Sequence, residues 1–263
     1  MASGDIEWVG LDVGNSNEVE KVILRVEPDA VIHAAALTNV DECETNKEKA
    51  YIVNFLGSLN IAKSCRMVGC YVIYVSTDYI FDGSKGLYKE KDTPNPLNYY
   101  GLTKLLGEVS TLATSEKNLV IRVSGLYGHS PSGKKNFGIT ALEKLVKGER
   151  VKAFVDQYLS PTYVPHLSYT IAKLIKSRPQ GVLHIAGERM SRYEFALLLS
   201  RKLGADESLV IPISITSFTF KAKRPLDSSL DTSKATSLGL GLPSQEVAVE
   251  DFIKTYFRFL RGK

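Results

Sequence analysis

YVIYVSTD, residues 71–78, is the stretch of this chain that decides its fold. Its first five residues are β-branched or aromatic, which is typical of a buried β-strand. Three polar residues, Ser76, Thr77 and Asp78, follow at the carboxyl end of that strand. In open α/β sheets, ligands bind at the carboxyl ends of the strands. The stretch therefore predicts a ligand site beside these three side chains.

Tyr100 and Lys104 follow this strand end by about two dozen residues. Side chains four residues apart share one face of an α-helix, so we expect the phenol and the ammonium group to point the same way. An unperturbed phenol titrates near pH ~10, and a neighbouring cation lowers its pKa. Such a phenol can act as a general acid near neutrality. With a hydroxyl of Ser76 or Thr77 holding the substrate oxygen, the set suits protonation of a carbonyl oxygen as hydride reaches its carbon.

An isolated Y-x-x-x-K spacing is better explained as a solvated pair of side chains on a helix. The preceding strand that ends in Ser-Thr-Asp makes the combination much more specific. We therefore interpret residues 76–104 as a catalytic unit.

Composition sets broad limits on the class of protein. Of the 263 residues, 44% are apolar and 24% are charged, as is usual for a globular protein. The net charge of +4 includes no dense basic stripe, which argues against nucleic-acid binding. No apolar run approaches the ~20 residues that span a bilayer, and the first residues lack a signal-peptide core. The cysteines, Cys43, Cys65 and Cys70, lack metal-site spacing, so we expect free thiols, no metal and a cytoplasmic protein.

Strands and helices alternate through the first half of the chain. We expect strands at residues 6–13, 30–33, 71–75 and 119–123, and helices at 17–25, after the capping pattern T-x-x-E at 45–48, and at 137–147. This alternation predicts an α/β fold with a doubly wound parallel sheet in residues 1–150.

The pattern loosens beyond Gly148. We expect strands at 151–154 and 181–186, and helices at 164–176, after the capping pattern S-x-x-E at 191–194, at 231–238 and at 247–260. We interpret residues 151–263 mainly as a smaller substrate-binding lobe over the carboxyl edge of the sheet.

Three features along the sheet need separate interpretation. The small residues at 34–38, AAALT, either let the backbone approach a ligand or pack a helix tightly against a strand. Asn54 either orders a water molecule or a backbone carbonyl near the site, or is a satisfied structural amide. The run GHSPSGKK at 128–135 is similar to a phosphate-binding loop, but Lys135 stands where a hydroxyl should hold magnesium. We interpret that run as a polar loop beside the site.

The strings STDYIFDG at 76–83 and YKEKDTPNPLNYYGLTKLLGE at 88–108 resemble the dTDP-4-dehydrorhamnose reductases, which are extended short-chain dehydrogenase/reductases. They are similar also to the regulatory β subunit of methionine adenosyltransferase, which shares that fold. The resemblance runs nearly end to end from Asp12 and implies a Rossmann-like, NAD(P)-binding sheet. Its other points are LDV at 11–13, HAAALTNVD at 33–41, RVS at 122–124, DQY at 156–158, SPT at 160–162, RP at 224–225 and SLD at 229–231.

This resemblance implies roles for individual residues. Thr77, Tyr100 and Lys104 would form the catalytic triad, in which Tyr100 is the acid and Lys104 lowers its pKa and holds the nicotinamide ribose. The NADPH or NADH cofactor would lie along Asp12, Val13, Ala35, Ala36, Leu37, Thr38, Tyr100 and Lys104. The substrate, a sugar nucleotide that is linked to dTDP in such enzymes, would contact Ser76, Thr77, Asp78, Ser124 and Gly125. The family usually has a Trp where this chain has Gly125, so the sugar pocket is altered. A homodimer is compatible with the resemblance.

The resemblance fails at the front of the chain. The family begins with a strand, a glycine-rich turn and a helix, whose backbone N–H groups meet the cofactor pyrophosphate. No G-x-G-x-x-G spacing occurs here, and Gly10 and Gly14 do not replace it. We expect roughly one βαβ unit, with a central strand of the sheet, to be missing. To explain the missing unit, we favour a recorded start that is too late, or a truncated chain, over a protein that has lost cofactor binding. If the chain truly starts at Met1, we expect it to bind NADPH weakly or not at all.

The sequence is compatible with three functions. The leading one is NAD(P)H-dependent reduction of a nucleotide-linked 4-keto-6-deoxy sugar, which the complete triad favours. A non-catalytic regulatory subunit is favoured by the missing glycine turn. An epimerase or dehydratase of a sugar nucleotide would use the same Tyr–Lys pair with a tightly held cofactor.

Overall fold

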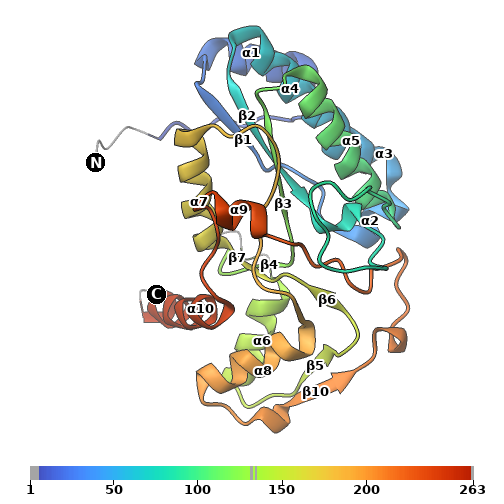
Figure 1. Ribbon diagram of the computed structural model, residues 1–263, viewed down its shortest axis with the longest axis vertical. Helices are drawn as coiled ribbons and strands as arrows, with labels where there is room; N and C mark the ends of the chain where they lie inside the picture. Colours follow the sequence, from blue (N-terminus) through green and yellow to red (C-terminus); the bar gives the residue numbers. More distant parts are fainter. Residues whose placement is uncertain (1–5, 131–132, 134, 262–263) are drawn as a thin grey trace.

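A parallel four-stranded sheet forms the centre of the larger part of the molecule (Figure 1). The computed structural model describes residues 6–130, 133 and 135–261. The strand order is β1 (Ala30–His33), β2 (Tyr71–Thr77), β3 (Leu119–Val123) and β8 (Gly181–His184). All three pairings are parallel, so the carboxyl ends of the strands lie at one edge. The predicted α/β fold is confirmed.

Helices cover both faces of this sheet, as expected for a doubly wound fold. Helices α1 (Ser16–Val26), α4 (Gly57–Val68) and α5 (Tyr99–Thr114) lie on one side, and α7 (Val164–Ser177) lies on the other (Figure 1). Successive side chains of a strand point to opposite faces. The β2 side chains therefore alternate, with Val72 in a cluster with α1 and α4 residues, and the next residue in a cluster with α7 residues.

A second hydrophobic cluster forms a smaller lobe at the carboxyl edge of the sheet, at the bottom of Figure 1. Its elements are α6 (Phe137–Val146), β5 (Val151–Phe154), α8 (Arg192–Leu203), β10 (Val210–Ile213) and α10 (Gln245–Arg261). Strand β8 and helix α7 come from the part of the chain after residue 150, so the chain returns to the sheet before it ends in the lobe. The predicted boundary at residue 150 between a cofactor-binding domain and a substrate-binding lobe stays a prediction.

Shorter elements connect these parts. They are α2 (Val40–Thr45), α3 (Lys47–Ala50), the π-helix Tyr51–Leu56, α9 (Ser233–Ser237), the 3-10 turns Asp78–Ile80, Glu207–Leu209 and Ile215–Ser217, and the two-residue strands β4 (Leu126–Tyr127), β6 (Tyr158–Leu159), β7 (Thr162–Tyr163) and β9 (Met190–Ser191). No helix within the described ranges combines the length and apolar character that crossing a membrane requires.

Two local predictions near the start of the chain are wrong. Residues 6–13 form no strand, because they pair with no other strand of the described chain, and Trp8 is 90% exposed. Thr45 is not a helix cap either, since its hydroxyl donates to a carbonyl of α2. The cap of α3 is Asn46, whose side chain accepts from Lys49 N at 3.2 Å. The second capping pattern is confirmed, because Ser191 and its partner three residues later bond reciprocally at the start of α8.

Strand β1 lies at an edge of the sheet. It pairs with β2, and no other strand of the described residues pairs with its second side. Ile32 in the middle of β1 is 45% exposed, although a β-branched residue usually fits a covered strand position.

Candidate active site

Helix α5 carries Tyr100 and Lys104 to the carboxyl end of β2. The Asn98 side chain caps the helix by accepting from Gly101 N at 2.9 Å. A Cβ at Gly101 would meet the backbone carbonyl oxygen of Tyr79, so a glycine allows the helix to approach the loop after β2. The helix is also tied to β3, because the buried Arg122 guanidinium donates to both oxygens of Glu108.

A cavity of about 580 Å³ lies between this helix start, the strand end and the smaller lobe. Its wall includes Ser76, Thr77, Asp78, Tyr100 and Lys104. The structure therefore brings the predicted catalytic triad to one cavity. Within the described part of the chain, the buried Ser76 hydroxyl has no hydrogen-bond partner. A buried polar group without a partner is costly, so Ser76 is ready to bond a ligand in the cavity.

Lys104 is buried and held in one position. Its Nζ donates to Val75 O at 2.7 Å and lies 4.1 Å from the ring centroid of Tyr74. Burial lowers the pKa of Lys104 to about 7, although the Glu108 carboxylate opposes this change. Lys104 therefore changes its charge close to neutral pH.

Tyr100 does not have the lowered pKa that the sequence predicts. Burial raises the pKa of its phenol, a hydrogen bond with Thr77 opposes this effect, and the Asp78 charge adds to it. The prediction is wrong because desolvation outweighs the other influences and because the Lys104 ammonium is directed to a strand carbonyl. The phenol therefore stays protonated at neutral pH, which is the state that a proton donor needs.

Asp78 and Ser124 form a polar floor under the cavity. Burial raises the pKa of Asp78, and three hydroxyl donors oppose that rise. Ser124 donates to one carboxylate oxygen at 2.8 Å, Ser228 donates to the same oxygen, and Thr77 donates to the other at 3.1 Å. Ser124 also accepts from Ser160 N and does not line the cavity. The structure thus places Ser124 behind Asp78, whereas the neighbouring Gly125 lies in the cavity wall.

The run after β1 contributes alternate residues to the cavity. Ala36 and Thr38 line it, whereas Ala35 and Leu37 do not. Asn54 explains this arrangement, because its amide accepts from Leu37 N at 2.8 Å and donates to Leu37 O at 3.1 Å. A third bond joins it to the Thr103 hydroxyl of α5. Asn54 is a satisfied structural amide, and it also orders the backbone beside the cavity.

Substitution of Asn54 by alanine is expected to lower the free energy of unfolding by about 1–3 kcal/mol, because buried backbone groups of Leu37 lose their partners. Urea unfolding measures this change. Asn60→Ala, which removes a half-buried amide that donates to Val13 O, is the matched control and is expected to cost less. Equal losses in the two variants would contradict the role given to Asn54.

Asp12 and Val13 lie away from the cavity. The Asp12 side chain accepts from Gly14 N at 2.9 Å in the turn before α1. Val13 packs closely on Gly57 of α4, where a Cβ would collide with its side chain. The structure does not bring these two predicted cofactor contacts to the cavity wall.

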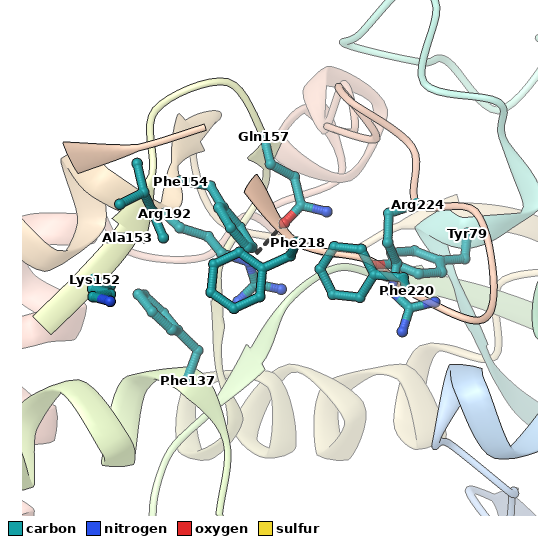
Figure 2. A pocket seen from close by; sticks show the side chains of 11 residues that line it. Tyr79, Phe137, Lys152, Ala153, Phe154, Gln157, Arg192, Phe218, Phe220 and Arg224 are labelled. Carbon is teal, nitrogen blue, oxygen red and sulfur yellow. Dashed lines mark hydrogen bonds between the residues drawn. The ribbon is translucent and has the colours of Figure 1, made fainter. Parts of the chain in front are cut away.

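A second, smaller pocket of about 160 Å³ adjoins the cavity (Figure 2). Tyr79, Gln157 and Arg192 line both spaces, so the two form one continuous cleft. Arg192 Nε donates to Gln157 Oε1 at 2.8 Å, the bond drawn in Figure 2. The pocket is also lined by four phenylalanines and a second arginine, namely Phe137, Phe154, Phe218, Phe220 and Arg224.

Sequence reasoning did not find this aromatic pocket. Arg224 lies in a run that the resemblance includes, and its guanidinium donates to Asp41 Oδ2 at 2.8 Å while facing the Phe220 ring. Phe218 and Phe220 lie in an irregular segment after β10, where no periodicity marks a buried or binding face. The sequence feature that could have indicated this pocket is the cluster of aromatic and basic residues at 218–224.

Metal ligation has no candidate in the part of the chain that the structure describes, since no group of three or more His, Cys, Asp or Glu side chains has a suitable arrangement. The three cysteines are free and buried.

Comparisons with known proteins agree with the fold. A family model described as the RmlD substrate binding domain matches residues 5–258. The spore coat polysaccharide biosynthesis protein SpsK of Bacillus subtilis is 30% identical over 93% of this chain and 85% of its own length. Methionine adenosyltransferase 2 subunit beta of Bos taurus is 32% identical over 86% of this chain and 70% of its own length.

A solved structure is also closely similar. The dTDP-4-dehydrorhamnose reductase of Bacillus anthracis in complex with NADP has a TM-score of 0.87 and 33% sequence identity, and the match covers 93% of this chain and 87% of that one. The resemblance predicted from the sequence is confirmed. The chain belongs to the family of the RmlD substrate binding domain, together with the dTDP-4-dehydrorhamnose reductases.

Proposed function

We propose that this chain is an NAD(P)H-dependent oxidoreductase that reduces a nucleotide-linked 4-keto-6-deoxy sugar, as dTDP-4-dehydrorhamnose reductases do. The observation that carries this proposal is the convergence of Thr77, Tyr100 and Lys104 on one cavity of about 580 Å³. A protonated phenol, a nearby hydroxyl and a lysine at the carboxyl end of a parallel sheet suit carbonyl reduction better than hydrolysis, for which no activated nucleophile is present among these residues.

The residues of the cavity fit the nicotinamide end of the cofactor. Ala36 and Thr38 contribute small residues to the cavity wall, which also includes Lys104 and Tyr100. The unpartnered Ser76 hydroxyl offers a hydrogen bond in the same space. When bound there, the nicotinamide cofactor supplies the hydride.

Tyr100 donates the proton in the proposed reaction. Its phenol, which burial keeps protonated, gives its proton to the C4 oxygen of the sugar, while the Thr77 hydroxyl bonds the same oxygen and orients it. Lys104 lines the same cavity and, as the resemblance implies, would hold the nicotinamide ribose. Asp78 takes no part in the proposed proton transfer. Its hydrogen bonds with Ser124 and Ser228 hold the end of the strand in place.

The aromatic pocket is suited to the nucleotide part of the substrate. Phe154 and Phe218 meet edge to face with ring centroids 5.4 Å apart, and a planar base can stack on such rings. Arg192 and Arg224 also line this pocket, and Arg192 lines the catalytic cavity as well, so a diphosphate between base and sugar would meet guanidinium groups. The cleft therefore matches the order base, diphosphate and sugar.

Phe218→Ala is expected to weaken dTDP binding about tenfold, because base stacking on an aromatic side chain contributes on the order of 1–3 kcal/mol. Calorimetric titration with dTDP measures the effect. Leu226→Ala is the matched control, since Leu226 is an exposed residue of the same connecting segment outside the pocket. Unchanged affinity in Phe218→Ala would exclude the pocket as the nucleotide site.

The test of the reductase activity is the oxidation of NADPH, followed by its absorbance, in the presence and in the absence of a dTDP-linked 4-keto-6-deoxy sugar. Sugar-dependent loss of NADPH is expected. Loss of the keto sugar with no consumption of NADPH would support the epimerase or dehydratase alternative instead.

The similarity to methionine adenosyltransferase 2 subunit beta favours a second candidate, a regulatory subunit. Relatives with that name are 32–34% identical over 85–88% of this chain. Size-exclusion chromatography with a methionine adenosyltransferase catalytic subunit, run beside the NADPH assay, separates the two functions. A stable complex without sugar-dependent NADPH oxidation would favour the regulatory role.

A further inference from the structure

A side cavity of about 210 Å³ opens beside the catalytic cavity. Gly125, Leu126 and Leu159 line both spaces, so the side cavity begins where the sugar is proposed to lie. Its wall is built from β4, β6 and the starts of α6 and α8, and it shares only Phe137 and Arg192 with the aromatic pocket.

Gly125 allows the walls of the side cavity to approach each other closely. Its φ is +51°, a conformation that side-chain-bearing residues rarely adopt. A Cβ at this position would collide with Cδ1 of Leu159. A side chain at residue 125 would therefore displace Leu159, and the glycine allows Leu159 to line both spaces at this point.

The wall of the side cavity is mainly apolar. Leu126, Leu159, Pro161 and Phe195 supply hydrocarbon surface. The Asn136 amide in the same wall is already satisfied, since it donates to Gly128 O at 2.8 Å and Asn136 accepts from Ile139 N at 3.0 Å. Apolar cavities of roughly 150 Å³ stay dry and accept small apolar molecules. The side cavity consequently favours an apolar group over a hydroxyl.

One polar group at the edge narrows the chemistry of the occupant. Arg192 lines the side cavity, and its described hydrogen bond uses Nε only, with Gln157 as acceptor. Its terminal amino groups can therefore donate to a carbonyl oxygen at the edge of an apolar space. An acetamido group combines such an oxygen with a methyl group of suitable size.

We propose that the side cavity is a specificity subsite for an acylamino substituent on the sugar ring, so that the preferred substrate is an acetamido sugar nucleotide. This inference rests on the proposed function, because it requires the sugar to lie beside Tyr100. The methyl group would pack on Leu126 and Leu159, and the acyl oxygen would accept from Arg192.

The test uses calorimetry to compare the affinities of the full chain for UDP-glucose and UDP-N-acetylglucosamine. The second compound carries an acetamido group where the first carries a hydroxyl. We expect about tenfold tighter binding of the acetamido compound, in line with the discrimination that an apolar pocket gives. Leu126→Phe and Leu126→Trp should narrow the side cavity in two steps, and the preference should fall in the same order. Leu126 is 41% exposed, so both variants are expected to fold.

Val109→Trp, on the exposed face of α5, is the control for adding an aromatic ring and should keep the preference of the parent chain. Equal affinities for the two compounds in the parent chain, or a preference that both Leu126 variants retain, would overturn the subsite. These results do not depend on turnover. If the preference and its loss are seen but no keto sugar is reduced, the subsite stands and the proposed reductase activity fails.

Discussion

Tyr100→Phe is expected to lower the rate of keto-sugar reduction by about 10²–10⁴-fold, the usual contribution of a positioned general acid. The variant loses one oxygen atom and keeps the ring, which packs near Tyr79 with a centroid distance of 6.0 Å. We therefore expect the fold and the affinity for the nucleotide to change little. Steady-state NADPH oxidation with the keto sugar measures kcat, and calorimetry with dTDP measures the affinity.

Tyr99→Phe is the matched control for this substitution. Tyr99 is the neighbouring residue on α5, its backbone N–H donates to Glu44, and it does not line the cavity. This control should keep nearly the full rate. A Tyr100→Phe chain that retained full turnover would exclude the phenol as the proton donor.

Lys104→Met is expected to abolish most of the activity and to stabilise the protein at pH 6. An ordinary lysine titrates near pH ~10.4. The folded chain lowers the pKa of Lys104 to about 7, so between pH 7 and pH 10 the unfolded chain binds more protons than the folded chain. Stability therefore rises with pH through this window, and the full cost of the buried lysine is present below pH 7.

Methionine removes this cost and also the bond from Lys104 to Val75 O. We expect a net gain of about 2 kcal/mol in the free energy of unfolding at pH 6, which shrinks toward pH 10. Urea unfolding at the two pH values measures it, and Lys117→Met, at an exposed lysine, should show neither the gain nor its pH dependence. If the gain in the free energy of unfolding caused by Lys104→Met were smaller at pH 6 than at pH 10, the lowered pKa of Lys104 would be contradicted.

Much of the fold follows from local patterns in the sequence. Strands at 30–33, 119–123 and 151–154 have the predicted bounds, because each is a short, mainly apolar run that pairs with a neighbouring strand. Residues 6–13 have a similar composition but form no strand, since a strand depends on a partner that a local pattern cannot reveal. Tertiary pairing decides between these cases.

The candidate site is predictable in part for a similar reason. The topology of a parallel sheet brings Thr77 and Tyr100 together, so motif spacing suffices to predict their meeting. The raised pKa of Tyr100 is a consequence of burial, which spacing does not report. The position of Ser124 behind Asp78, and the arrival of Phe218 at the cleft, depend on contacts between residues more than 40 positions apart.

Transfer of deuterium from NADPH deuterated at the hydride position of C4 is the most direct test of the proposed reduction. The full chain is incubated with this cofactor and dTDP-4-keto-6-deoxy sugar, and the product is examined by mass spectrometry and NMR. We predict one deuterium on C4 of the sugar for each NADPH oxidised. A product without deuterium, or a keto sugar that remains unreduced while a nucleotide is bound in the cleft, would contradict the assignment of this chain as a sugar-nucleotide reductase.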